Sequence, residues 1–260
     1  PDLTVTALTT DKAGIGPGES FKATITLMNQ GAVAALDPSY VRYYLSSDAT
    51  YDSSDILLSG DAYVSSLAAG ASQSFTTTLY TSSTLAIGNY QLLARADATE
   101  QLTEVSEANN VKNVALSVGR PDLIVSALTT NKASYGAGES LSISYSVQNS
   151  GLGGSGSSAT TKFYLSKDAT LDNGDLYLGS DTLNQLSAGA VQNDALTLDL
   201  PSYLPQGAGS YYVIASTDSN GNVLESNESN NTRVTTAVTV QAPDLTVTAL
   251  TTDKAGIGPG

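Results

Sequence analysis

The stretch FKATITL, residues 21–27, alternates apolar and polar residues along its whole length, and LSISYSV, residues 141–147, repeats the alternation. A period of two places the apolar side chains on one face of a strand and the polar side chains on the other. Each stretch therefore predicts a strand with one buried face and one solvated face.

Further strands are predicted outward from residues 21–27, separated by clusters of Gly, Ser, Asn and Asp; they are 41–45, 56–58, 74–79, 90–96 and 114–118. About seven short strands in a segment of this length are typical of an aligned β-sandwich. The content of glycine and β-branched residues argues against any helix of useful length. The sequence predicts an all-β fold made of immunoglobulin-like sandwiches.

A long repeat sets the number of domains. PDLTVTALTT at residues 1–10 returns as PDLIVSALTT from Pro121 and again from Pro243, at steps of 120 and 122 residues. This period matches a whole domain, whereas solenoid repeats span 20 to 50 residues. We therefore predict two tandem sandwich domains, 1–120 and 121–242, each with its own core.

The third copy of the repeat is identical to the first. Residues 243–260 match 1–18 at every position, whereas 121–138 differ from 1–18 at six positions, so the order is type A, type B, type A. Residues 243–260 are predicted to supply the first strand and turn of a further type A repeat. They are too short to bury a core and are expected to be disordered or to lean on a neighbour. The linkers are only two residues long, so neighbouring domains should lie close together.

Composition excludes several classes of function. Eleven basic against 25 acidic residues give a net charge of −14, which repels nucleic acid and anionic lipid. No apolar run approaches the length of about 18 residues that a membrane helix needs, so we predict no membrane insertion. The chain has no Cys and no His, which removes disulfides, thiolate chemistry and the usual general base. We predict that it is not an enzyme, since only paired carboxylates, as in glycosidases, remain available.

An acidic loop between two predicted strands occurs in both repeats. It has the spacing Asp-x3-Asp-x2-Asp and comprises Asp48, Asp52 and Asp55, then Asp168, Asp172 and Asp175. Calcium takes six to eight oxygen ligands, and three close carboxylates without a cation repel one another. We interpret both loops as Ca²⁺ ligands, with magnesium less suited. The alternative is that Asp is simply a favourable turn residue.

A second acidic run joins the last two predicted strands of each repeat. Its acidic positions are Asp97, Glu104 and Glu107, then Asp218, Glu225 and Glu228, and each run ends in Asn-Asn. Asn carbonyls and Glu carboxylates both suit calcium, but Asp and Asn in hairpins also bond their own backbone. These six residues are therefore either additional calcium ligands or braces of the turn.

These marks together resemble a known family. The resemblance is carried by the initial PDL, by Gly18-Glu19-Ser20, Asn29-Gln30-Gly31, Tyr44-Leu45-Ser46-x-Asp48 and the closing Glu104-x2-Glu107-x-Asn109-Asn110, and by their counterparts in the second repeat. This pattern is similar to the CARDB domain, named for its relation to cell adhesion in bacteria. The resemblance implies an immunoglobulin-like sandwich, an extracellular or bacterial cell-surface location, tandem use and no catalysis.

One motif is set aside. Residues 151–156, GLGGSG, satisfy the dinucleotide pattern G-x-G-x-x-G, but no helix is predicted to follow and the first repeat lacks the glycines. We interpret this segment as a loop.

Two functions remain open. The first is a calcium-stiffened structural module of a long surface, fibre or filament protein, whose partners are neighbouring repeats that can assemble into fibres. The second is an adhesive module that binds a glycan or a host receptor. Carbohydrate sites need exposed aromatics, and the chain has 14 Tyr but no Trp. The candidates among them are Tyr43, Tyr44, Tyr63 and Tyr80.

Overall fold

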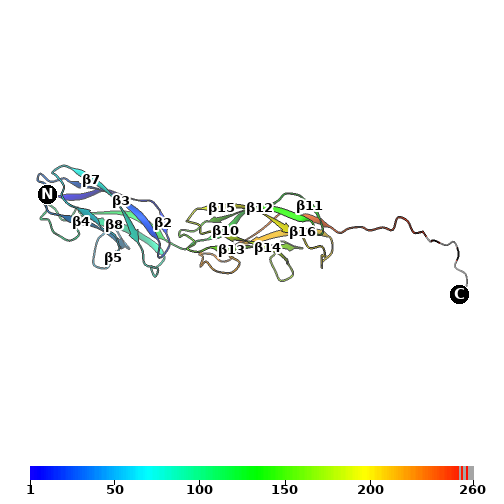
Figure 1. Ribbon diagram of the computed structural model, residues 1–260. Helices are drawn as coiled ribbons and strands as arrows, with labels where there is room; N and C mark the ends of the chain where they lie inside the picture. The colour runs from blue at the N-terminus through cyan, green and yellow to red at the C-terminus, as the bar shows by residue number, and fades with distance from the viewer. Residues whose placement is uncertain (252, 254–255, 257–260) are drawn as a thin grey trace.

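The computed structural model describes residues 1–251, 253 and 256 of the chain. Across these residues the regular structure consists of 18 strands and no helix. Figure 1 shows two β-domains placed end to end, joined by a short connection, with residues 243–251 leading away from the second domain. The all-β fold in two tandem sandwiches, predicted from the sequence, is confirmed.

Nine strands form the first domain. They are β1 (Leu3–Thr10), β2 (Gly14–Ile15), β3 (Ser20–Asn29), β4 (Ser39–Ser46), β5 (Ile56–Leu57), β6 (Ala62–Val64), β7 (Ser72–Tyr80), β8 (Gly88–Arg95) and β9 (Val111–Val118). One sheet has the order β1-β3-β7. The other has the order β2-β9-β8-β4-β5, with β6 also paired to β4.

The alternation of β3 explains how the first core forms. Phe21, Ala23, Ile25 and Leu27 are fully buried, while the residues between them face the other way. The same cluster takes in apolar residues of β4, β8 and β9 from the opposite sheet. Burying a Leu or Ile side chain contributes about 1.5–3 kcal/mol, so this shared face holds the two sheets together.

The second domain repeats this plan. Its strands are β10 (Leu123–Thr130), β11 (Ser134–Gly136), β12 (Ser140–Asn149), β13 (Ala159–Ser166), β14 (Leu176–Leu183), β15 (Val191–Asp199), β16 (Gly209–Ser216), β17 (Thr232–Val234) and β18 (Val238–Gln241). The sheets run β10-β12-β15 and β11-β18-β16-β13-β14, with β17 paired to β16. Its core cluster draws on the second repeat alone.

Some strands differ from the sequence prediction. The two-residue β2 and the three-residue β6 were not predicted, because strands this short show no periodic pattern in the sequence. The type B repeat has one continuous β14 where the type A repeat has β5 and β6. Each described domain therefore has nine strands where about seven were predicted.

The repeated segment after the second domain forms no strand over residues 243–251, and Leu245 is 91% exposed. In the first domain the same sequence is a strand because β1 pairs with β3 from Leu3 opposite Asn29 onward. Residues 243–251 have no such pairing within the described part of the chain. The predicted turn lies partly outside the described residues.

Candidate metal centre

The first acidic loop connects β4 to β5, and its carboxylates brace the loop itself. Asp48 Oδ1 accepts the Thr50 N–H at 2.7 Å, and Asp52 Oδ1 accepts the N–H and the hydroxyl of Ser54 at 2.7 and 2.6 Å. Asp55 Oδ2 accepts the Asp52 N–H at 2.9 Å. The Ser54 hydrogen bonds lower the pKa of the Asp52 carboxyl. Asp48 and Asp52 are exposed, so water also solvates them.

The corresponding loop of the second domain connects β13 to β14 and has the same bonds. Asp168 Oδ1 accepts the Thr170 N–H at 2.8 Å, and Asp172 Oδ1 accepts the Gly174 N–H at 2.7 Å. Asp175 Oδ2 accepts the Asp172 N–H at 2.9 Å. In both loops these carboxylates bond the N–H groups of their own turn, as Asp does in an Asx-turn.

The second acidic run lies between β8 and β9 and begins with a buried aspartate. Asp97 is 1% exposed, and its two carboxylate oxygens accept the N–H groups of Gln101 and Leu102 at 3.1 and 2.9 Å. Its backbone has φ of +40°, which Asp tolerates better than most residues. Asp218 repeats this arrangement in the second domain, with φ of +42° and bonds to the N–H groups of Asn222 and Val223. These two aspartates position the rest of the run.

Glu104 extends from this run to the first strand. Its Oε2 accepts the Leu3 N–H at 3.1 Å, across 101 residues of sequence. Its Oε1 is buried and has no hydrogen-bond partner among the described residues. The side-chain oxygens of Asn109 and Asn110 are also buried and unpartnered. All three atoms are acceptors, so none of them can satisfy another.

Electrostatics at Glu104 disfavour its charge in the absence of a cation. Burial raises the pKa of the Glu104 carboxyl to about 7, and the carboxylates of Glu107 and Asp97 also raise it. The Leu3 N–H and the Asn110 amide act in the opposite direction but do not cancel the effect. The Asn110 amide lies near Glu104 but donates its hydrogen bond to Glu107 Oε2, at 3.2 Å. The site concentrates oxygen lone pairs and negative charge.

The second domain has the same centre, with its carboxylates closer together. One oxygen from each of Asp218, Glu225 and Glu228 lies within 4.8 Å of the others. Glu225 is 3% exposed, and burial raises the pKa of its carboxyl to about 7. It accepts the Leu123 N–H and, at 2.7 Å, the Asn231 amide. The side-chain oxygens of Asn230 and Asn231 are buried and have no hydrogen-bond partner in the part of the chain that the structure describes.

The donor set suits a hard cation. Buried acceptors without partners are costly, and a buried carboxylate needs a positive charge beside it. An ion coordinated by carboxylate and amide oxygens satisfies both needs, and oxygen-only sites favour Ca²⁺ or Mg²⁺ over softer metals. The residues that fit such an ion are Glu104, Glu107, Asn109 and Asn110 in the first domain and Asp218, Glu225, Glu228, Asn230 and Asn231 in the second.

The prediction from the sequence omitted two kinds of residue here. The Asn pairs were read only as part of the run, although their oxygens are the unpartnered ones. Asp2 was not selected, yet its Oδ1 accepts the Asn109 amide and its Oδ2 accepts the Gln30 amide, both at 2.9 Å. Asp122 accepts the Asn230 amide in the same way. The recurrence of Pro-Asp-Leu at the start of each repeat was the available signal.

The fold and the centre define a class: tandem immunoglobulin-like sandwiches with an oxygen-lined acidic site where the first strand meets the last loop. The CARDB family model matches the chain twice, over residues 1–114 and 120–235. The chain therefore belongs to the CARDB family, a non-catalytic family related to bacterial cell adhesion. The suspected resemblance is confirmed.

Solved structures include two of one CARDB domain from Pyrococcus furiosus. The crystal structure, in complex with di-metal ions, has 23% identity and a TM-score of 0.35, covering 45% of this chain and 88% of that one. The solution structure has 22% identity and a TM-score of 0.33, covering 45% and 94%. A CBD12 structure from CALX1.2 has 9% identity and a TM-score of 0.34, covering 83% and 79%. No curated protein matches the chain.

We also searched the described residues for a helix that could span a membrane. None of the described residues forms a helix with the length and apolarity needed to cross a bilayer.

Proposed function

We propose that this chain is a structural repeat module of a long bacterial extracellular or cell-surface protein, and that Ca²⁺ bound at the two acidic centres stabilises it. The observation that carries the proposal is the set of buried, unpartnered oxygens beside Glu104 and at Asn230 and Asn231. Membership of an adhesion-related family supports the location and the absence of catalysis. Calcium sites of extracellular modules bind with Kd of about 10⁻⁴–10⁻³ M. We expect a Kd in this range for the two centres, because they are partly exposed to solvent.

Calcium is a better fit than magnesium because the ligands come from an irregular loop. Calcium accepts six to eight oxygens in flexible geometry, whereas magnesium requires a near-ideal octahedron and retains much of its water. Amide and carboxylate oxygens spread over Glu104 to Asn110 supply many ligands without symmetry. Magnesium is therefore the matched control ion for every calcium measurement.

The position of the centre explains what the ion would do mechanically. Glu104 already bonds the start of β1, and Val105 N–H bonds the Pro1 carbonyl at 3.1 Å. In the second domain Glu225 bonds Leu123, and the Ser226 N–H donates to Pro121, which directly follows the linker. An ion held there would fix the path of the chain where one domain leads into the next.

Calorimetry of the full chain tests the calcium proposal. After exhaustive chelation, titration with calcium should give binding heat for two sites, and both domains should melt at higher temperature than in chelator. Magnesium at the same concentration should give a smaller shift. Small-angle scattering should show increased bending between the domains in chelator. Identical melting curves and scattering profiles with and without calcium would remove the ion from the proposed function.

Adhesive binding of a glycan is the second candidate, favoured by one aromatic pair. Tyr40 and Tyr63 lie with ring centroids 5.4 Å apart, and Tyr63 is 55% exposed. Of the four tyrosines proposed from the sequence, Tyr63 and Tyr80 are exposed, whereas Tyr43 and Tyr44 are buried in the fold. A glycan array with wild type and the Tyr63→Ala variant tests this function. Specific binding that the substitution abolishes would favour it, and an array without signal would exclude it for the glycans tested.

A further inference from the structure

The connection between the two domains includes a close contact between glycines and Leu152, whose side chain remains 48% exposed. Leu152, in the loop after β12, lies against Gly14 and Gly119 of the first domain. A Cβ atom added at Gly14 would lie 3.0 Å from Leu152 Cδ2, and one added at Gly119 would lie 2.9 Å from Leu152 Cβ. Such distances are too short for carbon atoms. Glycine at both positions therefore lets Leu152 approach this closely without being displaced.

The backbones of the two domains also meet directly. A Cβ atom at Gly153 would lie 2.6 Å from the Gly119 carbonyl oxygen and 2.8 Å from Gly16 Cα. Any side chain at Gly153 would push the domains apart. The first domain thus presents a surface made of Gly14, Gly16, Glu19 and Gly119, which we call the glycine surface.

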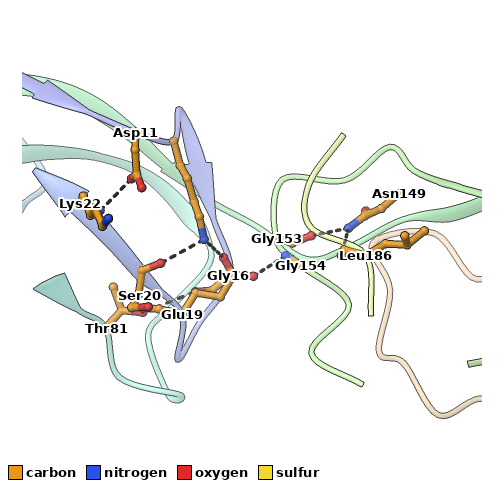
Figure 2. A network of polar contacts seen from close by, with 11 residues as sticks. Asp11, Gly16, Glu19, Ser20, Lys22, Thr81, Asn149, Gly153, Gly154 and Leu186 are labelled. Atoms are coloured by element: carbon orange, nitrogen blue, oxygen red, sulfur yellow. Dashed lines mark hydrogen bonds and ion pairs between the residues drawn. The ribbon is translucent and has the colours of Figure 1, made fainter. Parts of the chain in front are cut away.

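A hydrogen bond aligns this contact. The Gly154 N–H donates to Glu19 Oε1 across the domain boundary, as Figure 2 shows. Glu19 is held from its own side, because Oε2 accepts Lys12 Nζ at 3.3 Å and the Glu19 carbonyl accepts the Thr81 hydroxyl at 2.9 Å. A Cβ atom at Gly154 would lie 2.6 Å from Glu19 Oε1. A side chain at Gly154 would therefore require the Glu19 carboxylate to shift from its present position, which would disturb this charge-assisted bond.

The first domain has the same loop with different residues. The Asn149 amide donates to the Gly153 carbonyl at 2.8 Å, and the Asn29 amide donates to the Val33 carbonyl at 2.9 Å. This shared bond makes Val33 the counterpart of Gly153. Ala32 then stands where the second domain has Leu152, and Ala34 stands where it has Gly154.

The second domain, in turn, keeps Gly136 and Glu139 at the positions of Gly16 and Glu19 but lacks the other two glycines of the surface. Its parallel pair β11–β18 corresponds to β2–β9, which places Ser134 at the position of Gly14 and Gln241 at the position of Gly119. Its Glu139 bonds within its own domain, accepting the Gly136 N–H at 2.8 Å and pairing with Lys132. The end of the second domain therefore offers two side chains where the first offers open space.

We propose that the glycine surface is a docking surface specific for a following domain that carries the loop Leu152-Gly153-Gly154. The two domains in this order form a rigid pair, and the reverse order cannot pack in this way. In the reverse order Val33 and Ala34 would replace the two loop glycines, and Ser134 and Gln241 would fill the surface. Residues 243–260 repeat the start of the first domain, so this sequence contains the beginning of the reverse junction.

This inference rests on the proposed structural role but not on calcium. It predicts that a polymer of alternating domains has two kinds of junction, one docked and one loose. Rigid two-domain segments would then be joined by bending points, with a spacing set by the repeat of the pair.

Distance measurements between spin labels test the docking. The chain has no cysteine, so Thr78→Cys and Ser180→Cys introduce unique labelling sites on exposed residues of the two domains. The wild-type background should give one narrow distance distribution. The triple substitution Leu152→Ala, Gly153→Val, Gly154→Ala, which copies the loop of the first domain, should abolish the narrow peak.

The matched control makes the opposite exchange in the loop that docks to nothing here. Ala32→Leu, Val33→Gly, Ala34→Gly alters the first domain away from the junction and should leave the distribution unchanged. Circular dichroism and melting of both variants verify that the domains remain folded. A narrow peak at the native distance in the Leu152 triple variant would overturn the proposal.

Reversing the order of the domains gives a gain-of-function test, which is feasible because each domain has its own core. The second domain followed by the first should give a broad distribution. Adding Ser134→Gly and Gln241→Gly to the second domain, and Ala32→Leu, Val33→Gly, Ala34→Gly to the first, should narrow the distance distribution. A reverse pair that is already narrow would contradict the proposed specificity.

Repeating the measurements in chelator separates this proposal from the calcium proposal. The difference between wild type and the Leu152 triple variant should persist in chelator. Failure of the calcium proposal would leave the melting temperature insensitive to calcium, whereas failure of the docking proposal would leave the two distance distributions alike.

Discussion

The first acidic loop and the second acidic run of each domain carry similar charge in the sequence but have different environments in the fold. Asp48 and Asp52 are exposed, and their oxygens accept N–H groups of the same loop. Glu104 bonds the start of β1, and its other carboxylate oxygen is buried and has no partner among the residues that the structure describes. The difference teaches that acidic density alone does not define an ion site. What matters is whether the fold removes water from the carboxylate and leaves lone pairs unused.

Removing the buried charges should have the largest effect. Glu104→Gln with Glu225→Gln keeps the side-chain volume but removes the charged ligands, and its new amide nitrogens can donate to the unpartnered Asn oxygens. Calorimetry should show loss of the calcium increment, which for each site is about 2.7 kcal/mol at 100 times the Kd. In chelator the variant should be at least as stable as wild type.

The matched control for this comparison is Asp48→Asn with Asp168→Asn, made in the exposed loops. These substitutions remove as many charges and should leave the calcium increment intact. Equal loss of the increment in both variants would erase the distinction between the two regions. It would support the prediction from the sequence that the loop aspartates are calcium ligands.

The Asn oxygens should have the next largest effect. Asn110→Ala and Asn231→Ala each remove one neutral ligand while every carboxylate remains. We expect calcium affinity to fall by about tenfold in the altered domain, on the scale observed for residues that support metal ligands. Isothermal titration measures the change. Unaltered affinity would show that these oxygens face something other than the ion.

The pH dependence in chelator should have opposite signs in the two regions. Folding raises the pKa of Glu104 and Glu225 from the ordinary value of 4.5 to about 7. The folded state therefore binds more protons between these values, and stability should fall as pH rises from 4.5 to 7. Folding lowers the pKa of Asp52 below its ordinary value of 3.8. Its contribution to folding stability is therefore present above pH 3.8 and is lost as pH falls through the pKa of the folded state.

Urea unfolding in chelator across this interval measures the slope. The Glu104→Gln, Glu225→Gln variant should flatten it, and the Asp48→Asn, Asp168→Asn control should not. A slope that the first variant leaves intact would place the titrating groups elsewhere in the molecule.

The smallest effect is expected in the exposed loop. Asp48→Ala removes one acceptor of the Thr50 N–H, which water can replace because the loop is solvated. Stability measured by urea unfolding should change by about 0.5 kcal/mol or less. A loss several times larger in calcium alone would indicate that this carboxylate contacts the ion.

Period-two alternation was enough to predict the long strands, since residues 21–27 and 141–147 lie inside β3 and β12. Short pairings such as that of β2 with β9 could not be predicted, because two residues are too few to show a period. The sequence located both acidic runs but favoured the aspartate loops over the run that contains Glu104. Burial of Glu104 depends on Leu3, which is 101 residues away. Residues 151–156 form a loop between β12 and β13, as the sequence predicts, but the contact of Leu152 with Gly14 and Gly119 can be seen only in three dimensions.

The parallel pairing of β2 with β9 has a consequence for a chain under tension. Pulling on the two ends of the first domain draws β2 and β9 in opposite directions along their length, so their hydrogen bonds are sheared together instead of opening one after another. The second domain has three paired residues in β11 with β18, where the first has two. Single-molecule pulling should therefore rupture the first domain at lower force than the second, so that the first domain is the first to unfold when the chain is stretched.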